Sequence, residues 1–211
     1  IRLRRGRFAE AVALYDAILL DDPLDAEAFH NRGFALERLG RLSEALGNYT
    51  RAIVLCPQSP EAYCNRGNTL FSLKRYDQAV AQYDAALVLR PDYAAALNNK
   101  ANALVSLKRV GEALPCLHRA LVLAPEYVEA HNNLGYALQK IGRHREALES
   151  LDRALALRPD YAEAHNNRGH SLQKLRRFDE ALASFERAIE LRPDYADAIW
   201  NRGLVRRHVS Q

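Results

Sequence analysis

Residues 162–195 read AEAHNNRGHSLQKLRRFDEALASFERAIELRPDY, and residues 128–161 read VEAHNNLGYALQKIGRHREALESLDRALALRPDY. The two segments have the same length and share their proline, their small residues and an asparagine pair in register. Outward from them, prolines recur every 34 residues along the chain, at Pro23, Pro57, Pro91, Pro125, Pro159 and Pro193. A fixed period of this size predicts a solenoid of stacked helical units.

The period divides the chain into five full 34-residue repeats with a partial repeat at each end. Positions are counted from the first residue of each repeat, so that the periodic proline is position 32. The repeats are 1–25 (partial), 26–59, 60–93, 94–127, 128–161, 162–195 and 196–211 (partial). Because each repeat of a solenoid packs on its neighbours, we expect residues 1–211 to form a single array rather than separate globular domains.

Each full repeat is expected to contain two helices. The first runs to a turn such as Leu39-Gly40-Arg41, and the second stops before the proline, which lacks an amide hydrogen and clashes with the preceding helical turn. Glycine or alanine at position 8 and alanine at position 20 allow the paired helices to approach closely. Large residues at positions 11 and 24, such as Leu36 and Tyr49, fill the space between them.

This arrangement of small and large residues resembles the tetratricopeptide repeat family over essentially the whole chain. The resemblance implies an all-α fold, a right-handed α-α superhelix in which the first helices line a concave groove. It also implies a protein-binding scaffold with no enzyme activity of its own. Position 4 departs from the family's usual aromatic residue, since the later repeats carry Leu97, His131 and His165 there.

Position 6 is asparagine in every repeat that contains it. Asparagine is a mediocre helix former, so its repetition within a helix needs a reason. A side-chain amide carries both a donor and an acceptor, like a peptide bond. The run is similar to the asparagine ladder in the superhelix of O-linked N-acetylglucosamine transferase, where the ladder holds substrate polypeptide. Alternatively, the amides cap or cross-brace adjacent helices.

We therefore predict that the groove binds an extended polypeptide segment. The predicted contact residues are Asn31, Asn65, Asn99, Asn133, Asn167 and Asn201 at position 6, Asn98, Asn132 and Asn166 at position 5, Asn102, Tyr136 and His170 at position 9, and Lys140 and Lys174 at position 13. A carboxylate clamp of the kind found in chaperone-binding members of the family is incomplete here, because position 5 carries no lysine.

Two further sets of charges have structural interpretations. Acidic residues at position 2, such as Glu27 and Glu61, lie in the first helical turn, where they complement the helix dipole. Position 7 carries a basic residue in most repeats, including Arg32, Lys100 and Arg168. We expect the stems of these side chains to pack while their charged ends reach acids on a neighbouring helix.

No cofactor, metal site or catalytic centre is predicted. His131, His165 and His170 lack the spacing of zinc ligands, and the sequence has no glycine-rich phosphate loop or nucleophile elbow. A net charge of +4, from 30 basic and 26 acidic residues, is too balanced to indicate nucleic-acid binding. The sequence also lacks an apolar stretch long enough to span a membrane. The three cysteines suit a reducing compartment, so a cytoplasmic location is expected.

The last helix suggests a second kind of contact. It contains Ile199, Trp200, Leu204 and Val205, and no partner helix follows it in the sequence. We therefore expect weak end-to-end self-association through this helix. Two other interpretations stay open: the chain is the substrate-recruiting part of a larger enzyme such as a glycosyltransferase, or it is a self-assembling structural array.

Overall fold

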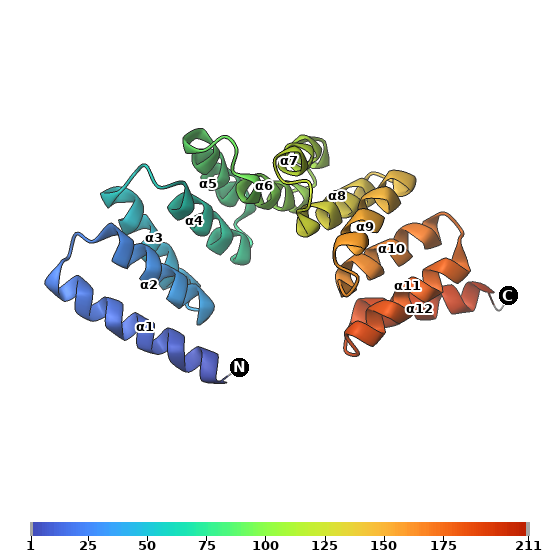
Figure 1. The fold of residues 1–211 in the computed structure, drawn as a ribbon, viewed down its shortest axis with the longest axis horizontal. Helices are drawn as coiled ribbons and strands as arrows, with labels where there is room; N and C mark the ends of the chain where they lie inside the picture. Colours follow the sequence, from blue (N-terminus) through green and yellow to red (C-terminus); the bar gives the residue numbers. More distant parts are fainter. Residues whose placement is uncertain (1, 210–211) are drawn as a thin grey trace. The chain divides into compact units, whose positions relative to one another are not determined.

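The computed structural model describes residues 2–209, and within that range the chain forms twelve helices and no strand (Figure 1). The helices are α1 (Arg2–Asp21), α2 (Ala26–Arg38), α3 (Leu42–Leu55), α4 (Pro60–Ser72), α5 (Tyr76–Leu89), α6 (Ala94–Ser106), α7 (Val110–Leu123), α8 (Val128–Lys140), α9 (His144–Leu157), α10 (Ala162–Lys174), α11 (Phe178–Leu191) and α12 (Ala196–Val209). The predicted all-α fold and the two helices of each repeat are confirmed. None of these helices is long and apolar enough to cross a membrane.

The chain divides into two compact units, which are described separately. The amino-terminal unit ends at Leu107 and contains α1 to α6, and the carboxy-terminal unit begins at Lys108 and contains α7 to α12. Within each unit, successive helices pack against each other, and first helices of adjacent repeats also touch. A first helix therefore has more than one packed side.

The turn between the two helices has the same backbone geometry in five repeats. After α2, the Arg41 amide donates to the Leu36 carbonyl at 2.9 Å and the Gly40 amide donates to the Glu37 carbonyl at 2.9 Å. This pair of bonds ends a helix through a residue in the left-handed conformation. Position 15 has a positive φ in every case, with glycine in two repeats and lysine or arginine in three: Gly40, Lys74, Lys108, Gly142 and Arg176.

The core of each unit depends on close approach between the two helices of a repeat. A Cβ atom placed on Gly67 would lie 2.6 Å from Cε1 of Tyr83, and one on Gly169 would lie 2.7 Å from Cε1 of Phe185. Both aromatic rings are fully buried. Position 8 therefore lacks a side chain in these repeats because the ring at position 24 occupies that space.

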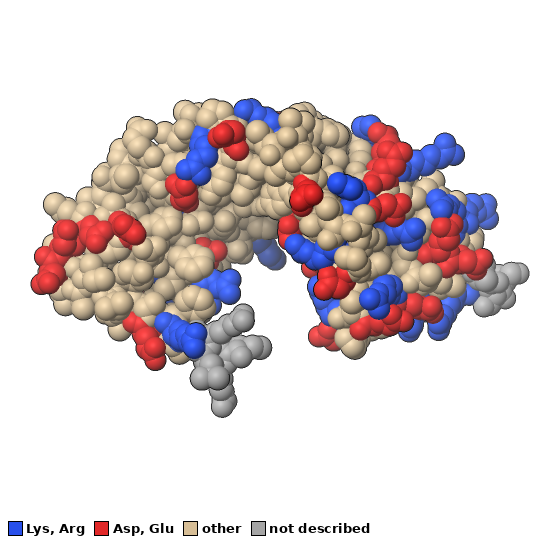
Figure 2. Space-filling view, in the orientation of Figure 1, with Lys and Arg blue, Asp and Glu red and all other residues tan. Residues whose placement is uncertain are grey.

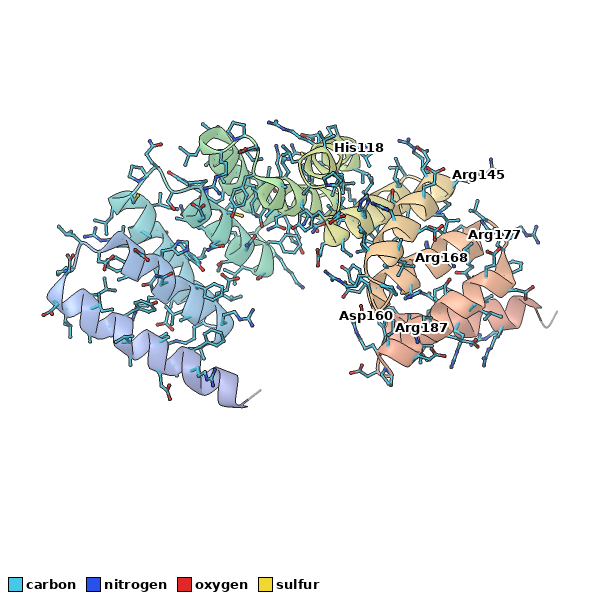
Figure 3. All side chains as sticks on the ribbon, viewed as in Figure 1. His118, Arg145, Asp160, Arg168, Arg177 and Arg187 are labelled. Carbon is cyan, nitrogen blue, oxygen red and sulfur yellow. The ribbon has the colours of Figure 1, made fainter. Side chains whose placement is uncertain are left out.

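The predicted position-7 ion pairs are confirmed in three repeats. Each cation reaches an aspartate at position 25 of the preceding repeat, on the neighbouring second helix. The pairs are Arg32 with Asp16 at 2.7 Å, Lys100 with Asp84 at 2.6 Å, and Arg168 (labelled in Figure 3) with Asp152 at 2.7 Å. Where position 25 is not acidic, position 7 differs: Arg66 donates to Gln82 in its own repeat, and Leu134 is apolar.

Candidate functional site

Several position-6 asparagines lie where the first helices of adjacent repeats of one unit touch. Three of them donate their Nδ2 group across this contact to position 5 of the preceding repeat. Asn65 bonds to His30 Nε2 at 3.2 Å, Asn167 to Asn132 Oδ1 at 2.9 Å and Asn201 to Asn166 Oδ1 at 3.2 Å. In all three pairs the acceptor is 35 residues earlier in the chain. These amides thus brace neighbouring repeats, as in the structural alternative left open by the sequence.

The three position-5 asparagines are buried. The exposed fractions are 3% for Asn98, 5% for Asn132 and 8% for Asn166. This placement differs from the prediction that these residues line an open groove. For Asn132 and Asn166, the next repeat's first helix covers this position, and each side chain accepts a hydrogen bond from that helix.

The position-6 amides are only half-buried, and two of them keep part of their hydrogen-bonding capacity. Asn167 and Asn201 use Nδ2 in the brace, while Oδ1 of each accepts no hydrogen bond from the described residues. An amide oxygen can accept from a peptide N–H group. Asn99 differs, because its Nδ2 donates to Asn68 at 2.9 Å and its Oδ1 accepts from Asn98 at 3.1 Å.

A pocket of about 220 Å³ in the carboxy-terminal unit gathers six of the predicted residues. We call it the tryptophan pocket, and its lining comprises Tyr136, Gln139, Lys140, Asn166, Asn167, His170, Asp197, Trp200 and Asn201. Three of these, Gln139, Asp197 and Trp200, were not among the predicted contact residues. Trp200 was assigned instead to self-association, and its side chain is 64% exposed.

The polar groups around the tryptophan pocket are held in defined positions. Lys140 Nζ lies 4.5 Å from the centre of the Tyr136 ring, a cation–π contact. Gln139 Nε2 donates to Ser171 Oγ at 2.7 Å, which fixes its side chain. Burial, and then the charge of Lys174, lower the pKa of His170, so its imidazole is neutral at pH 7.

The remaining predicted contacts lie elsewhere. A pocket of about 250 Å³ in the amino-terminal unit is lined by Asn68, Phe71, Ser72, Tyr83, Asn99 and Asn102. Asn31 lines a separate pocket of about 450 Å³ in the same unit. Asn133 is half-buried, and Lys174 is exposed at the end of α10.

The terminal helix only partly matches the predicted self-association surface. Ile199 and Trp200 are exposed, at 41% and 64%, and Leu204 is half-buried. Val205 is wrongly assigned to this surface, since it is fully buried and packs in a core cluster with Leu172 and Phe185. Helix α11, the second helix of the preceding repeat, packs against α12 and helps to bury Val205. The sequence-based prediction considered only the missing helix after α12 and overlooked this contact.

The sequence and the fold were compared with protein families and with solved structures. Models of the tetratricopeptide repeat match residues 1–60, 60–93, 92–160 and 162–195. No curated protein matches the chain. Among solved structures, YrrB, described as a TPR protein with an unusual peptide-binding site, is 25% identical with a TM-score of 0.68; the match covers 90% of this chain and 97% of YrrB.

Two other solved structures are similar over most of their length. TTC0263 from Thermus thermophilus is 27% identical with a TM-score of 0.71, over 85% of this chain and 98% of TTC0263. A segment of MamA from Desulfovibrio magneticus RS-1 is 26% identical with a TM-score of 0.71, over 81% of this chain and 97% of that segment. The family models together span nearly the whole sequence, and the chain belongs to the tetratricopeptide repeat family.

Proposed function

We propose that this chain is a protein-interaction scaffold that binds an extended polypeptide across its first helices, with the tryptophan pocket as the principal contact of the carboxy-terminal unit. The peptide-binding site named for YrrB, a similar tetratricopeptide repeat protein, supports this class of function. The observation that carries the proposal is the combination, in one pocket, of an exposed tryptophan with amide oxygens that remain available as acceptors.

Each part of the pocket matches one feature of an extended peptide. The Oδ1 atoms of Asn167 and Asn201 supply acceptors for backbone N–H groups, and the Nδ2 bonds hold both amides in a fixed orientation. The rings of Trp200 and Tyr136 provide apolar surface that a bound side chain would remove from water. Fixed groups of this kind lower the entropy that binding costs.

The aromatic part is tested with a library of fluorescent extended peptides and the variants Trp200→Ala and Tyr136→Ala. We expect the best-binding peptides to lose at least tenfold in affinity with Trp200→Ala, since buried aromatic anchors dominate such interfaces. The control is Val122→Ala, which removes an 80% exposed side chain from α7 in the same unit. Equal binding by wild type, Trp200→Ala and Val122→Ala would contradict the proposed pocket.

The amide part is tested with two substitutions at one residue. Asn201→Asp keeps an acceptor oxygen but removes the Nδ2 donor, whereas Asn201→Ala removes both. If Oδ1 of Asn201 accepts a hydrogen bond from a backbone N–H group of the peptide, Asn201→Asp retains more peptide affinity than Asn201→Ala. Circular dichroism and the thermal midpoint of each variant report the brace separately. Equal peptide affinity of the two variants and wild type would assign Asn201 to bracing alone.

A further inference from the structure

A second ion pair recurs within individual repeats and was not predicted from the sequence. Arginine at position 31 reaches glutamate at position 2 and lies over the ring of tyrosine at position 34. The arginine–glutamate distances are 2.5 Å for Arg90–Glu61, 2.8 Å for Arg158–Glu129 and 3.4 Å for Arg192–Glu163. The Cζ atoms of these three arginines lie 4.9, 5.1 and 4.6 Å from the centres of the Tyr93, Tyr161 and Tyr195 rings, respectively. We call this three-residue unit the arginine brace.

Two full repeats lack the arginine brace, and they lack it in different ways. In repeat 94–127 both charges are missing, because Ala95 replaces the acid and Ala124 replaces the arginine. In repeat 26–59 the acid is retained as Glu27, but Cys56 replaces the arginine and Ser59 replaces the tyrosine. Glu27 has no ion pair among the described residues, so repeat 26–59 presents half of the brace.

The 450 Å³ pocket of the amino-terminal unit lies at this incomplete brace. Its lining includes Glu27, Cys56 and Ser59, the three brace positions of repeat 26–59. Cysteine and serine are much smaller than the arginine and tyrosine of the other repeats. The pocket therefore corresponds to the volume that those larger side chains fill elsewhere.

The rest of the lining suits a cation with an aliphatic stem. Ala26, Ala52 and Ala62 give apolar walls against which methylene groups can pack. His30 adds no positive charge at pH 7, because burial lowers its pKa despite the opposing effect of Glu61 and Glu27. Glu61 also lines the pocket but is already engaged by Arg90.

We propose that this pocket binds an arginine side chain of a partner polypeptide, which pairs with Glu27 and completes the brace from outside. The chain itself uses arginine at the equivalent place in all three complete braces. A guanidinium group forms planar paired hydrogen bonds with a carboxylate, which the point charge of lysine does not. The inference rests on the proposed protein-binding function only in that the arginine belongs to a polypeptide.

The direct test uses a probe too short to occupy the tryptophan pocket as an extended peptide. Acetyl-Gly-Arg-Gly-amide is titrated into the 211-residue chain while amide NMR shifts are followed, in parallel with the lysine analogue. We expect shifts around Glu27 and Cys56 with the arginine probe, and about fivefold weaker binding by Glu27→Gln. Glu126→Gln, which alters an exposed acid in the other unit, is the matched control and should leave the affinity unchanged.

Two results of this titration would overturn the proposal: no saturable shifts with the arginine probe, or equal affinity for the arginine and lysine probes. Either result can occur while long peptides still bind at Trp200, so the two proposals fail separately. Conversely, loss of long-peptide binding leaves this titration interpretable.

A second variant fills the pocket from within. Cys56→Arg combined with Ser59→Tyr restores the residues of a complete brace beside Glu27. We expect this double variant to lose detectable probe binding. We expect no net rise of its thermal midpoint, because the gain from one exposed ion pair is offset by the loss of the Ser59 hydroxyl, which accepts from the Ala62 amide and caps α4. Ala124→Arg is the control, because it lies in the other unit and Ala95 offers it no acid, and it should leave probe binding unchanged. Unchanged probe binding by the folded double variant would contradict the assignment of the pocket.

Discussion

The two compact units share their helix packing but differ in the chemistry of their pockets. The amino-terminal unit has a pocket with Glu27 and Glu61, whereas the carboxy-terminal unit has one with Lys140 and Trp200. On the face drawn in Figure 2, charged side chains are dense over the carboxy-terminal unit and sparse over much of the amino-terminal unit. The positions that set helix packing stay nearly constant along the chain, while the exposed positions are free to specialise.

The inter-repeat amide bonds show the same division between a constant and a variable partner. Among the described residues of the carboxy-terminal unit, the two bonds from position 6 to position 5 join asparagine to asparagine, at Asn167–Asn132 and Asn201–Asn166. In the amino-terminal unit the position-6 donors are again asparagines, but Asn65 bonds to His30 at position 5 and Asn99 bonds to Asn68 at position 9. The donor of these inter-repeat bonds is therefore constant, whereas the residue that accepts the bond differs from repeat to repeat.

The largest expected effect tests whether the two units have equivalent packing. Gly67→Val and Gly169→Val each place carbon atoms inside the van der Waals contact distance of a buried aromatic ring. We expect each to lower the free energy of unfolding by about 3 kcal/mol, as overpacking of a tight core does. Urea denaturation of the two variants measures this directly.

Gly47→Val and Gly111→Val are the matched controls, one in each unit. A Cβ atom at either glycine meets nothing within 4 Å. These variants should be nearly neutral, because valine is a slightly better helix former than glycine. A loss confined to one of the two tight glycines would break the equivalence of the units.

The amide bonds should contribute differently in the two units. Asn167→Ala leaves the buried Oδ1 of Asn132 without its donor, and we expect a loss of about 2 kcal/mol. Asn65→Ala leaves the ring nitrogen of His30, which is only half-buried and can bond to water, so about 1 kcal/mol is expected. Thermal unfolding measures both, and Asn102→Ala serves as the near-neutral control. Equal losses at Asn167 and Asn65 would show that burial of the acceptor does not set the cost.

The sequence predicted the fold well because a solenoid repeats its packing rules. Every first helix of a full repeat begins at position 1, and every second helix ends before the periodic proline. The ion pairs of Arg32, Lys100 and Arg168 were predictable for the same reason, since a cation beside the packed side of a helix reaches an acid on its neighbour. Local periodicity was sufficient for these features.

The site was less predictable because it depends on contacts between first helices of different repeats. A helical wheel with one packed side places Asn132 and Asn166 on the open face, whereas the neighbouring first helix buries them. The arginine brace joins residues 29 positions apart and is also invisible to a helical wheel. Its signal was nevertheless present, since Ala95 and Ala124 replace both partners of the pair together.

The smallest expected effect is a difference in acid sensitivity between the units, which differ in their buried histidines. Burial is the largest cause of a lowered pKa at one described histidine of the amino-terminal unit, His30, and at three of the carboxy-terminal unit, His144, His165 and His170. The rings of His144 and His170 also lie near each other, with centres 6.1 Å apart. The positive charges of Lys140 and Lys174 lower the pKa of His170 further. The folded carboxy-terminal unit therefore contains more histidines that bind a proton less readily than they do in the unfolded chain.

The sign of the effect follows from the direction of these shifts. Because the folded pKa of each histidine lies below the ordinary value of 6.5, the unfolded chain binds protons first as the pH falls. Stability from these groups is complete above pH 6.5 and is lost as the pH falls through the folded pKa values. The paired carboxylates of Glu44, Glu146 and Glu180 have pKa values below 4.5 and do not contribute between about pH 7.5 and 5.5.

Hydrogen exchange, corrected for intrinsic rates, measures the difference over that pH range. It should show a greater loss of protection in α8 to α11 than in α2 to α5. Three of the four histidines with lowered pKa values lie in α8 to α11, and only His30 lies in α2 to α5. His144→Gln combined with His170→Gln removes two of those three groups and should reduce the difference. Equal losses in the two units of the wild-type chain would argue against histidine protonation as a source of unequal stability.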